Sequence, residues 1–362
     1  MSPVVWHLVD AMGAGEELWG KERVIADVVA AQRERGIDAG VISFAPSGLS
    51  RYMRHQGLPV KELEDVSRRI PRRSLPALVS ILRARPGAVL HTHGYKANVV
   101  GRLARLLGAP IARLVATCHG WPDETPATRR YNALDRWSSF LSDTTTVPDP
   151  AMLGKFPRIV RGRAVHVANA IPDSPRPTAS DRATARKRFG LADGNLVAGT
   201  LGRFSEEKGI PEALRAAADP RSDGIVWAFG GSGPLEWCLR ESGPRVRCVG
   251  YVHAVASYFA ALDVFVQTSR SEGLSLALLE AMRAALPIVA TDVGATSYVL
   301  RDGHEAILVP AYDPNAIVDA LVRLRDDPAL RRVLGDAARA RFESEFRVDR
   351  VVRDFLHAYG RG

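Results

Sequence analysis

The stretch from Ser269 to Gly294 constrains the fold more than any other part of the sequence. It begins with polar residues up to Ser275, which indicate a loop. Apolar residues then recur at helical spacing until Pro287 ends the helix. The short apolar run 288–290 predicts a buried strand of a parallel sheet. A loop, a helix and a strand in such quick succession favour an α/β fold.

Two carboxylates in this stretch, Glu272 and Glu280, predict a ligand site. If all residues between them were helical, they would lie about 12 Å apart at roughly 1.5 Å per residue. This is about the span from the sugar to the ribose of a sugar nucleotide. The intervening helix N-terminus favours a diphosphate through its free N–H groups and dipole. The alternative interpretation is a solvated helix face, because the spacing alone is not specific.

The motifs around the two carboxylates resemble those of a known enzyme family. They are SEG, LLEAM, PIVATDVG and VLRDGHEAILVP, with LGRFSEEKGI, FGGSGPLE and VGYVHAVASYFAALDVFVQTSRSEG upstream. Together they resemble the donor-binding region of the retaining glycosyltransferases of family 4, strongly over 201–310 and more faintly in the N-terminal half. The resemblance implies an α/β fold with two Rossmann-like domains whose parallel sheets face a cleft, the type-B glycosyltransferase fold.

The length of the chain also favours two domains, because 362 residues exceed a comfortable single core. The segment PDSPRPTASD predicts a linker. We therefore expect an acceptor-binding domain over 1–170 and a nucleotide-sugar-binding domain over 171–344. In the family a C-terminal helix, here about 345–362, returns to the N-terminal domain. Its expected apolar face consists of Phe346, Val351, Phe355 and Tyr359.

Candidate donor-site residues follow predicted strands of the second domain. Arg203 and Lys208 come after the predicted strand 196–201, where a planar fork and a point charge can converge on a diphosphate. The alternative is two solvated loop cations. The resemblance assigns Glu272 to the sugar and Glu280 to the ribose. It adds further donor-binding positions, which are Gly20, Gly233, Tyr251, Val252, Gly273, Leu274 and Ser275.

Histidines mark the corresponding edge of the first domain. His119 follows the predicted strand 111–117, and ligands of α/β sheets bind outside the carboxyl ends of strands. The resemblance aligns it with the histidine that contacts the donor sugar. His93 and Tyr95 follow the predicted strand 88–91 in a turn similar to the family's HxHG turn, and we assign them to the acceptor. His91 is more simply a packing or capping residue.

Two further features of the first domain bear on the acceptor. Trp19 replaces a glycine of the family's double-glycine loop, and it either packs in the core or stacks on a sugar or an aromatic acceptor. The whole net charge of +9 lies in residues 1–170, with 24 Lys+Arg against 15 Asp+Glu. Part of it falls in the predicted irregular stretch 46–73, where Arg68 and Arg69 are acceptor candidates. Such a surface favours an anionic acceptor or membrane contact, although an arginine-rich composition yields the same charge.

The chemistry implied by the resemblance is transfer with retention of configuration. His119, Glu272, Arg203 and Lys208 form the expected catalytic set, with the departing phosphate taking the acceptor's proton. The sequence has no Asp-x-Asp pair, so we expect no metal and no cofactor. A UDP-sugar is a better candidate donor than a GDP-sugar. The expected acceptor is a hydroxyl of a lipid-linked glycan or a secondary metabolite.

Other functions remain as alternatives. A nucleotide-sugar 2-epimerase shares the architecture, and a non-catalytic sugar-nucleotide binder would keep the fold. The scarcity of aromatic residues among the arginines argues against nucleic acid as a partner, and Leu18 interrupts a dinucleotide fingerprint. Three scattered cysteines, no long apolar run and no signal-peptide pattern favour the cytoplasm, with the inner face of the membrane as a further location.

Overall fold

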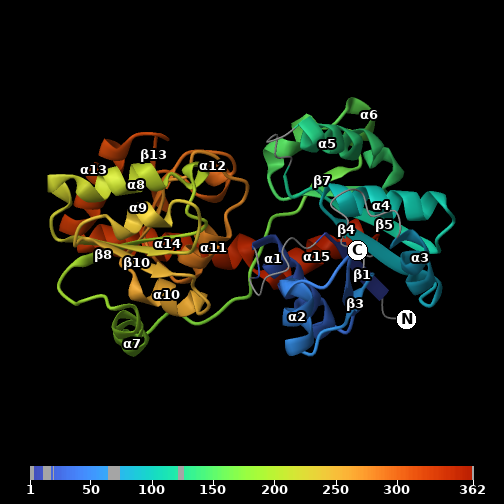
Figure 1. Cartoon of the computed structure of the whole chain (residues 1–362), viewed down its shortest axis with the longest axis horizontal. Helices are drawn as coiled ribbons and strands as arrows, with labels where there is room; N and C mark the ends of the chain where they lie inside the picture. The colour runs from blue at the N-terminus through green and yellow to red at the C-terminus, as the bar shows by residue number, and fades with distance from the viewer. Residues whose placement is uncertain (1–3, 11–17, 19, 64–73, 121–125, 361–362) are drawn as a thin grey trace. The chain divides into compact units, whose positions relative to one another are not determined.

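The computed structural model describes residues 4–10, 18, 20–63, 74–120 and 126–360. These residues form two compact units, each an α/β domain with its own parallel sheet (Figure 1). Unit 1 comprises Met1–Pro172 and Val348–Gly362, and unit 2 comprises Asp173–Arg347. The predicted α/β class with two Rossmann-like domains is therefore confirmed.

Unit 1 is built on a seven-stranded sheet in the order β3-β2-β1-β4-β5-β6-β7, in which all pairings are parallel. The strand order reverses direction between β1 and β4, which makes this the topological switch point where α/β sheets bind ligands. The strands are β1 (Val4–Val9), β2 (Asp38–Ser43), β3 (Val60–Glu62), β4 (Ala88–His93), β5 (Ile111–Thr117), β6 (Thr144–Val147) and β7 (Ala164–His166).

Helices from both ends of the chain cover this sheet. The C-terminal helix α15 packs beside α1, as the red and blue ribbons of Figure 1 show. Val351 and Phe355 of this helix are buried, as is Tyr359 directly after it, which confirms that the last helix belongs to the first domain. The helices of unit 1 are α1 (Gly20–Glu34), α2 (Gly48–His55), α3 (Leu75–Arg83), α4 (Tyr95–Leu106), α5 (Pro126–Ser138), α6 (Arg158–Arg161) and α15 (Val348–Ala358).

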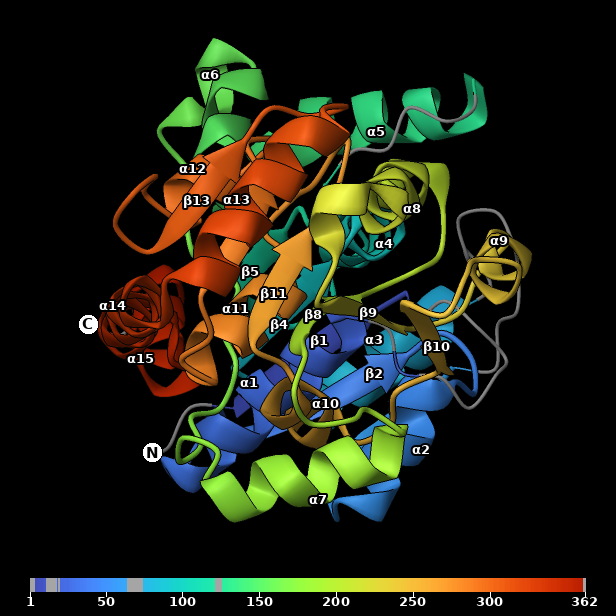
Figure 2. The same cartoon turned by 90° about the vertical axis from the view of Figure 1, so that its left-hand side faces the viewer.

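Unit 2 is built on a six-stranded parallel sheet in the order β10-β9-β8-β11-β12-β13. Its switch point lies between β8 and β11, which run side by side in Figure 2. The strands are β8 (Leu196–Leu201), β9 (Ile225–Gly230), β10 (Val246–Gly250), β11 (Val264–Gln267), β12 (Ile288–Thr291) and β13 (Ala306–Val309).

The helices of unit 2 form two layers. Figure 2 shows α8 and α13 together on one face of the sheet and α7 beside α10 on the other. One hydrophobic core, which includes Trp227, Phe229 and Leu321, lies under α8 and α13. The helices are α7 (Ala179–Phe189), α8 (Ile210–Ala218), α9 (Glu236–Arg240), α10 (Val255–Ala261), α11 (Leu276–Arg283), α12 (Thr296–Val299), α13 (Pro314–Asp326) and α14 (Pro328–Arg341).

The stretch from Ser269 to Gly294 folds as predicted. Residues 269–275 form the loop, α11 follows, and β12 begins one residue after Pro287. The turn between α11 and β12 is tight, because Ala285 has a positive φ of 57° and Leu286 N–H donates to the carbonyl of Ala281.

Three predictions about local structure were wrong. The stretch 46–73 contains α2 and β3: Ser47 caps α2 by accepting from the N–H of Ser50, and β3 pairs with β2. Strand β4 extends through His93, because its hydrogen bonding to β5 continues that far. Phe346 is buried but precedes α15, in a π-helical turn over Phe342–Phe346.

No helix among the described residues is both long enough and apolar enough to cross a membrane.

Candidate functional site

The loops after β8 and β11 meet at the switch point of unit 2. Lys208 comes from the first loop and Glu272 from the second, and Nζ of Lys208 lies 2.6 Å from Oε1 of Glu272. The predicted cation and carboxylate are therefore brought together at the edge of the sheet where α/β domains bind ligands.

Glu272 is held in one orientation. Ser269 Oγ donates to its Oε1 at 2.7 Å, the same oxygen that accepts from Lys208. The side chain is only 9% exposed. Among the described residues, both hydrogen bonds to Glu272 fall on Oε1, so Oε2 keeps its lone pairs for a ligand hydroxyl.

The backbone of Glu272 is fixed by Gly294, which follows β12. Gly294 has a φ of 56°, and a Cβ built on it would lie 1.8 Å from the carbonyl oxygen of Glu272. No side chain fits there, so the glycine permits the loops after β11 and β12 to touch.

A pocket opens beside the Lys208–Glu272 pair. It is lined by Arg203, Lys208, Glu272 and residues of β8 and β11. Arg203 is about half exposed and donates to Glu207 at 3.2 Å. The structure therefore places both predicted cations in one wall. Their contact with a diphosphate stays a prediction.

Helix α11 begins directly after this loop and carries Glu280. Ser275 is its N-cap residue and makes no side-chain cap bond, so the first N–H groups of the helix point toward the loop. Glu280 is mostly buried and forms an ion pair with Arg283 one turn further on. Only the second half of the Glu272–Glu280 spacing is helical, because α11 starts at Leu276.

The remaining predicted donor residues lie at several places. Gly273 and Leu274 precede α11, and Leu274 is buried. Gly233, after β9, packs against the backbone of Phe204 in the loop after β8, where an added Cβ would lie 2.5 Å from its oxygen. Tyr251 and Val252 follow β10; Tyr251 is partly exposed and Val252 is buried. Gly20, in unit 1, is the first residue of α1.

In unit 1, His119 follows the carboxyl end of β5 and is half-buried. The residue before it, Cys118, is buried and contacts Asp135 of α5, which also accepts from Asn98 and Arg102 of α4. This polar cluster fixes the chain just before His119.

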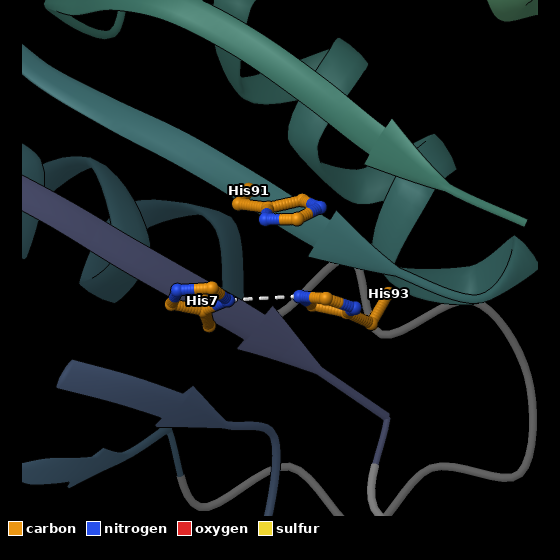
Figure 3. A group of neighbouring side chains, drawn as sticks. All are labelled: His7, His91 and His93. Carbon is orange, nitrogen blue, oxygen red and sulfur yellow. Dashed lines mark hydrogen bonds between the residues drawn. The ribbon is translucent and has the colours of Figure 1, made fainter. Parts of the chain in front are cut away.

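Three further histidines, His7, His91 and His93, lie together on the neighbouring strands β1 and β4 (Figure 3). His7 stands opposite His91 in the register of β1 and β4, and His93 lies two residues further along β4 on the same face. Nδ1 of His7 and Nε2 of His93 are 2.9 Å apart, and Nδ1 of His93 lies 3.2 Å from Nε2 of His119.

Burial keeps these rings neutral. It lowers the pKa of His7 to about 4, with Gln32 opposing the shift. Burial and, secondly, the charge of Lys21 lower the pKa of His119 to about 3. The pKa values of His91 and His93 are also lowered, mainly by burial and then by the neighbouring histidines.

His7, His91 and His93 form a group whose ring nitrogens are close enough to hold a metal ion, within 4.8 Å of one another. All six nitrogens, however, already have hydrogen-bond partners within the protein, at 2.7–3.2 Å. A metal would have to break some of these bonds. We therefore assign the group to a hydrogen-bond network.

The predicted acceptor residues are only partly described. Tyr95 begins α4 and stacks on Tyr131, with ring centroids 5.8 Å apart. His93 is buried and both of its ring nitrogens bond to other histidines. Trp19, Arg68 and Arg69 lie outside the described residues.

Sequence reasoning did not connect His7, Gln32 and Tyr359 with the histidines, and it placed Tyr359 only on an apolar helix face. His7 and Gln32 bond at 2.9 Å, and Gln32 in turn donates to the hydroxyl of Tyr359 at 3.1 Å. The one available signal was that His91 and His93 are two residues apart, which places them on the same face of a strand.

Family models and relatives agree with this geometry. The model for glycosyl transferases group 1 matches residues 195–327, and the model for glycosyltransferase family 4 matches residues 20–174. The two models together show that the chain is similar to family-4 glycosyltransferases in both of its Rossmann-like units. The two models fall one on each structural unit.

Among curated relatives, the chain is 33% identical to the alpha-D-kanosaminyltransferase of Streptomyces kanamyceticus, over 44% of each chain. It is 27% identical to the D-inositol 3-phosphate glycosyltransferase of Pseudarthrobacter chlorophenolicus, over 90% of this chain and 86% of the relative. Against several relatives the match spans only about half of their length, 44%, 44% and 55%.

Solved structures share the fold. HepE of Anabaena in complex with UDP-glucose superposes with a TM-score of 0.83 at 18% identity, covering 99% of both chains. Sucrose-phosphate synthase from Thermosynechococcus elongatus gives a TM-score of 0.79 at 20% identity, over 99% of this chain and 98% of that one.

Proposed function

We propose that this glycosyltransferase moves a sugar from a nucleotide-sugar, a UDP-sugar in preference to a GDP-sugar, to an acceptor hydroxyl with retention of configuration. The observation that carries the proposal is the Lys208–Glu272 pair in the pocket at the β8/β11 switch point. One complex of a neighbour with the same fold contains UDP-glucose, which supports this choice of donor.

The residues of the pocket suit the two ends of such a donor. Lys208, Arg203 and the N-terminus of α11 supply positive charge for a diphosphate, whose negative charge grows as the sugar–oxygen bond breaks. Oε2 of Glu272 accepts from a sugar hydroxyl, and Glu280 accepts from the ribose hydroxyls. His119 of unit 1 is assigned to the sugar by its resemblance to the family's histidine.

In this proposal the departing phosphate receives the acceptor's proton, and no metal is needed. The acceptor is anionic or lipid-linked, in keeping with the excess charge of +9 in residues 1–170. Contact with the inner face of the membrane through this basic half belongs to the same proposal.

The test is a panel of UDP- and GDP-sugars, scored by thermal shift and by donor hydrolysis without acceptor. A ligand at 100 times its dissociation constant adds about 2.7 kcal/mol of stability, which a thermal shift detects. The proposal is supported if one UDP-sugar stabilises the protein and is slowly hydrolysed by it, with the anomeric configuration kept in the product. No stabilisation by any nucleotide-sugar contradicts it, and complete conversion of the donor without acceptor into its 2-epimer favours the epimerase.

A further inference from the structure

A chain of seven hydrogen bonds runs through the carboxyl edge of the unit 1 sheet. It starts at His119 and passes through His93 and His7 to Gln32 of α1. It continues from Gln32 through Tyr359 and His91 to Thr117 and Thr146. Most of its side chains are buried, so water does not interrupt it.

The direction of the bonds among His7, His93 and His119 follows from Gln32. Its Oε1 can only accept, so Nε2 of His7 carries the proton and Nδ1 of His7 is an acceptor. A neutral imidazole has one donor and one acceptor. Nε2–H of His93 therefore donates to His7, and Nε2–H of His119 donates to Nδ1 of His93.

The second half of the chain has the same direction. Nε2 of Gln32 donates to the oxygen of Tyr359, and the phenol donates to Nδ1 of His91 at 2.8 Å. Nε2–H of His91 then donates to Thr117 at 2.7 Å. A phenol is a more acidic donor than an imidazole N–H, and an imidazole nitrogen is a better acceptor than a phenol oxygen. Tyr359 therefore favours this direction over the reverse.

Burial supports the same arrangement, because it keeps Tyr359 protonated and the histidines uncharged. It raises the pKa of Tyr359 above its ordinary value, and it lowers the pKa of His7 to about 4. Each member of the chain therefore has one proton to donate at neutral pH.

We propose that Gln32 and Tyr359 are positioning residues that fix His119 as the Nε2–H tautomer, so that its Nδ1 accepts a hydrogen bond from a hydroxyl of the transferred sugar. The part about the sugar rests on the proposed function; the tautomer does not. His119 then selects a hydroxyl donor and disfavours a phosphate or carboxylate oxygen at this position. The C-terminal helix takes part in the site through Tyr359.

The tautomer can be measured without any substrate. Full-length protein labelled with ¹⁵N-histidine gives long-range ¹H–¹⁵N spectra in which protonated and unprotonated ring nitrogens have distinct shifts. The His119 signals are assigned by their loss in His119→Gln. We expect an unprotonated Nδ1 and a protonated Nε2 at pH 7. A protonated Nδ1 on His119 overturns the proposal, as does a stoichiometric metal ion in the purified protein with metal-shifted signals from His7, His91 and His93.

Two variants test the role of the hydrogen-bond chain. Gln32→Met removes both amide bonds at similar volume, and Tyr359→Phe removes a single oxygen. We expect His119 to become a mixture of tautomers in both. Thr146→Val is the matched control, because it removes only the hydroxyl at the far end of the hydrogen-bond chain, and we expect it to leave the tautomer of His119 unchanged. An unchanged tautomer of His119 in Tyr359→Phe overturns the proposal. If Gln32→Met does not fold, Tyr359→Phe alone provides the test.

Donor analogues test the hydroxyl. We expect replacement of one sugar hydroxyl by fluorine to weaken donor binding by about tenfold, since fluorine cannot donate. In Tyr359→Phe the difference between the two donors should shrink several-fold. Equal binding of all fluorinated donors overturns the assignment of His119 to a hydroxyl. If no nucleotide-sugar binds at all, the proposed function fails. The measured tautomer of His119 still tests the role of the hydrogen-bond chain.

Discussion

Lys208 and Ser269 share a single oxygen of Glu272: both donate to Oε1, at 2.6 Å and 2.7 Å. The ion pair therefore orients the carboxylate and leaves its second oxygen directed to other partners. In the proposed function, the pair therefore links the cations assigned to the phosphates with the carboxylate assigned to the sugar.

Loss of the cation should weaken binding of the diphosphate. We expect Lys208→Met to raise the Kd for UDP by roughly 10- to 150-fold, because a hydrogen bond to a charged group contributes about 1.5–3 kcal/mol. Isothermal titration calorimetry measures it. The control is Arg221→Met, an arginine between α8 and β9 that pairs with Asp219 and Asp319. An equal loss in both variants would mean that Lys208 acts only through net charge.

Glu280→Gln should weaken binding of the ribose and leave the free protein nearly as stable. The amide oxygen of glutamine still accepts from Arg283, the present ion-pair partner. We expect a roughly tenfold or greater rise in the Kd for UDP and little change in the Tm without ligand. Removing both ribose hydroxyls from UDP should raise the Kd of the wild type but change the Kd of the variant little. If the Tm falls as much as the affinity, Glu280 is structural.

The buried histidines predict a loss of stability in acid. His7 has a folded pKa of about 4, below the unfolded value of about 6.5, so between these values the unfolded chain binds more protons. The free energy of unfolding is therefore unaffected by this linkage above pH 6.5. It falls as the pH drops from 6.5 toward 4, by up to about 1.4 kcal/mol per pH unit for each linked histidine.

Urea unfolding at several pH values measures this slope. His7→Gln should lower the stability at pH 7 but flatten its decline between pH 6.5 and 4. His357→Gln, at an exposed position of α15, is the matched control and should leave the slope as it is. A wild-type protein equally stable at pH 7 and pH 4.5 contradicts the burial of these rings.

Sugar transfer should survive EDTA. The sequence has no Asp-x-Asp pair, and Lys208, Arg203 and the start of α11 offer the charge that a metal would supply. Initial rates before and after chelation test this. Complete loss of activity, restored by Mg²⁺ or Mn²⁺, would refute the role of the cations.

The basic half of the chain should govern affinity for the acceptor. Changing Arg68, Arg69, Arg72 and Arg73, all outside the described residues, to Glu should raise the KM for an anionic acceptor and leave that for the donor nearly unchanged. The effect should weaken at 1 M salt, where the Debye length falls to about 3 Å. If the variant uses a neutral acceptor efficiently, the excess positive charge reflects only the arginine-rich composition and has no role in binding the acceptor.

The parts of the fold that the sequence predicted well are those with strong local signals. Strands β5 and β8 have the expected bounds, since β8 is a nearly continuous buried run and the last four residues of β5 are buried. Helix α2 was missed because its arginines suggested an irregular loop, although Leu49 and Met53, four residues apart, are both buried.

The candidate site shows the same contrast between residues with a local sequence signal and residues without one. Lys208 and Glu272 could be placed because each lies in the loop that follows a strand at the switch point of the sheet. The bond between Gln32 and Tyr359 could not, since 327 residues separate them and neither lies in a motif. Such contacts are created by packing α15 against α1, which periodicity alone does not specify.

The return of α15 to unit 1 determines the order in which the two units can be completed during synthesis. Unit 2 is one continuous segment, and its two ends lie together: Val348 N–H donates to the carbonyl of Ile171 at 3.0 Å, and Arg347 lies 3.6 Å from Asp173. It can therefore fold while the ribosome is still translating. Unit 1, although its synthesis begins first, lacks Phe355 and Tyr359 until the segment that follows unit 2 emerges, so its core is completed after unit 2 has been synthesised.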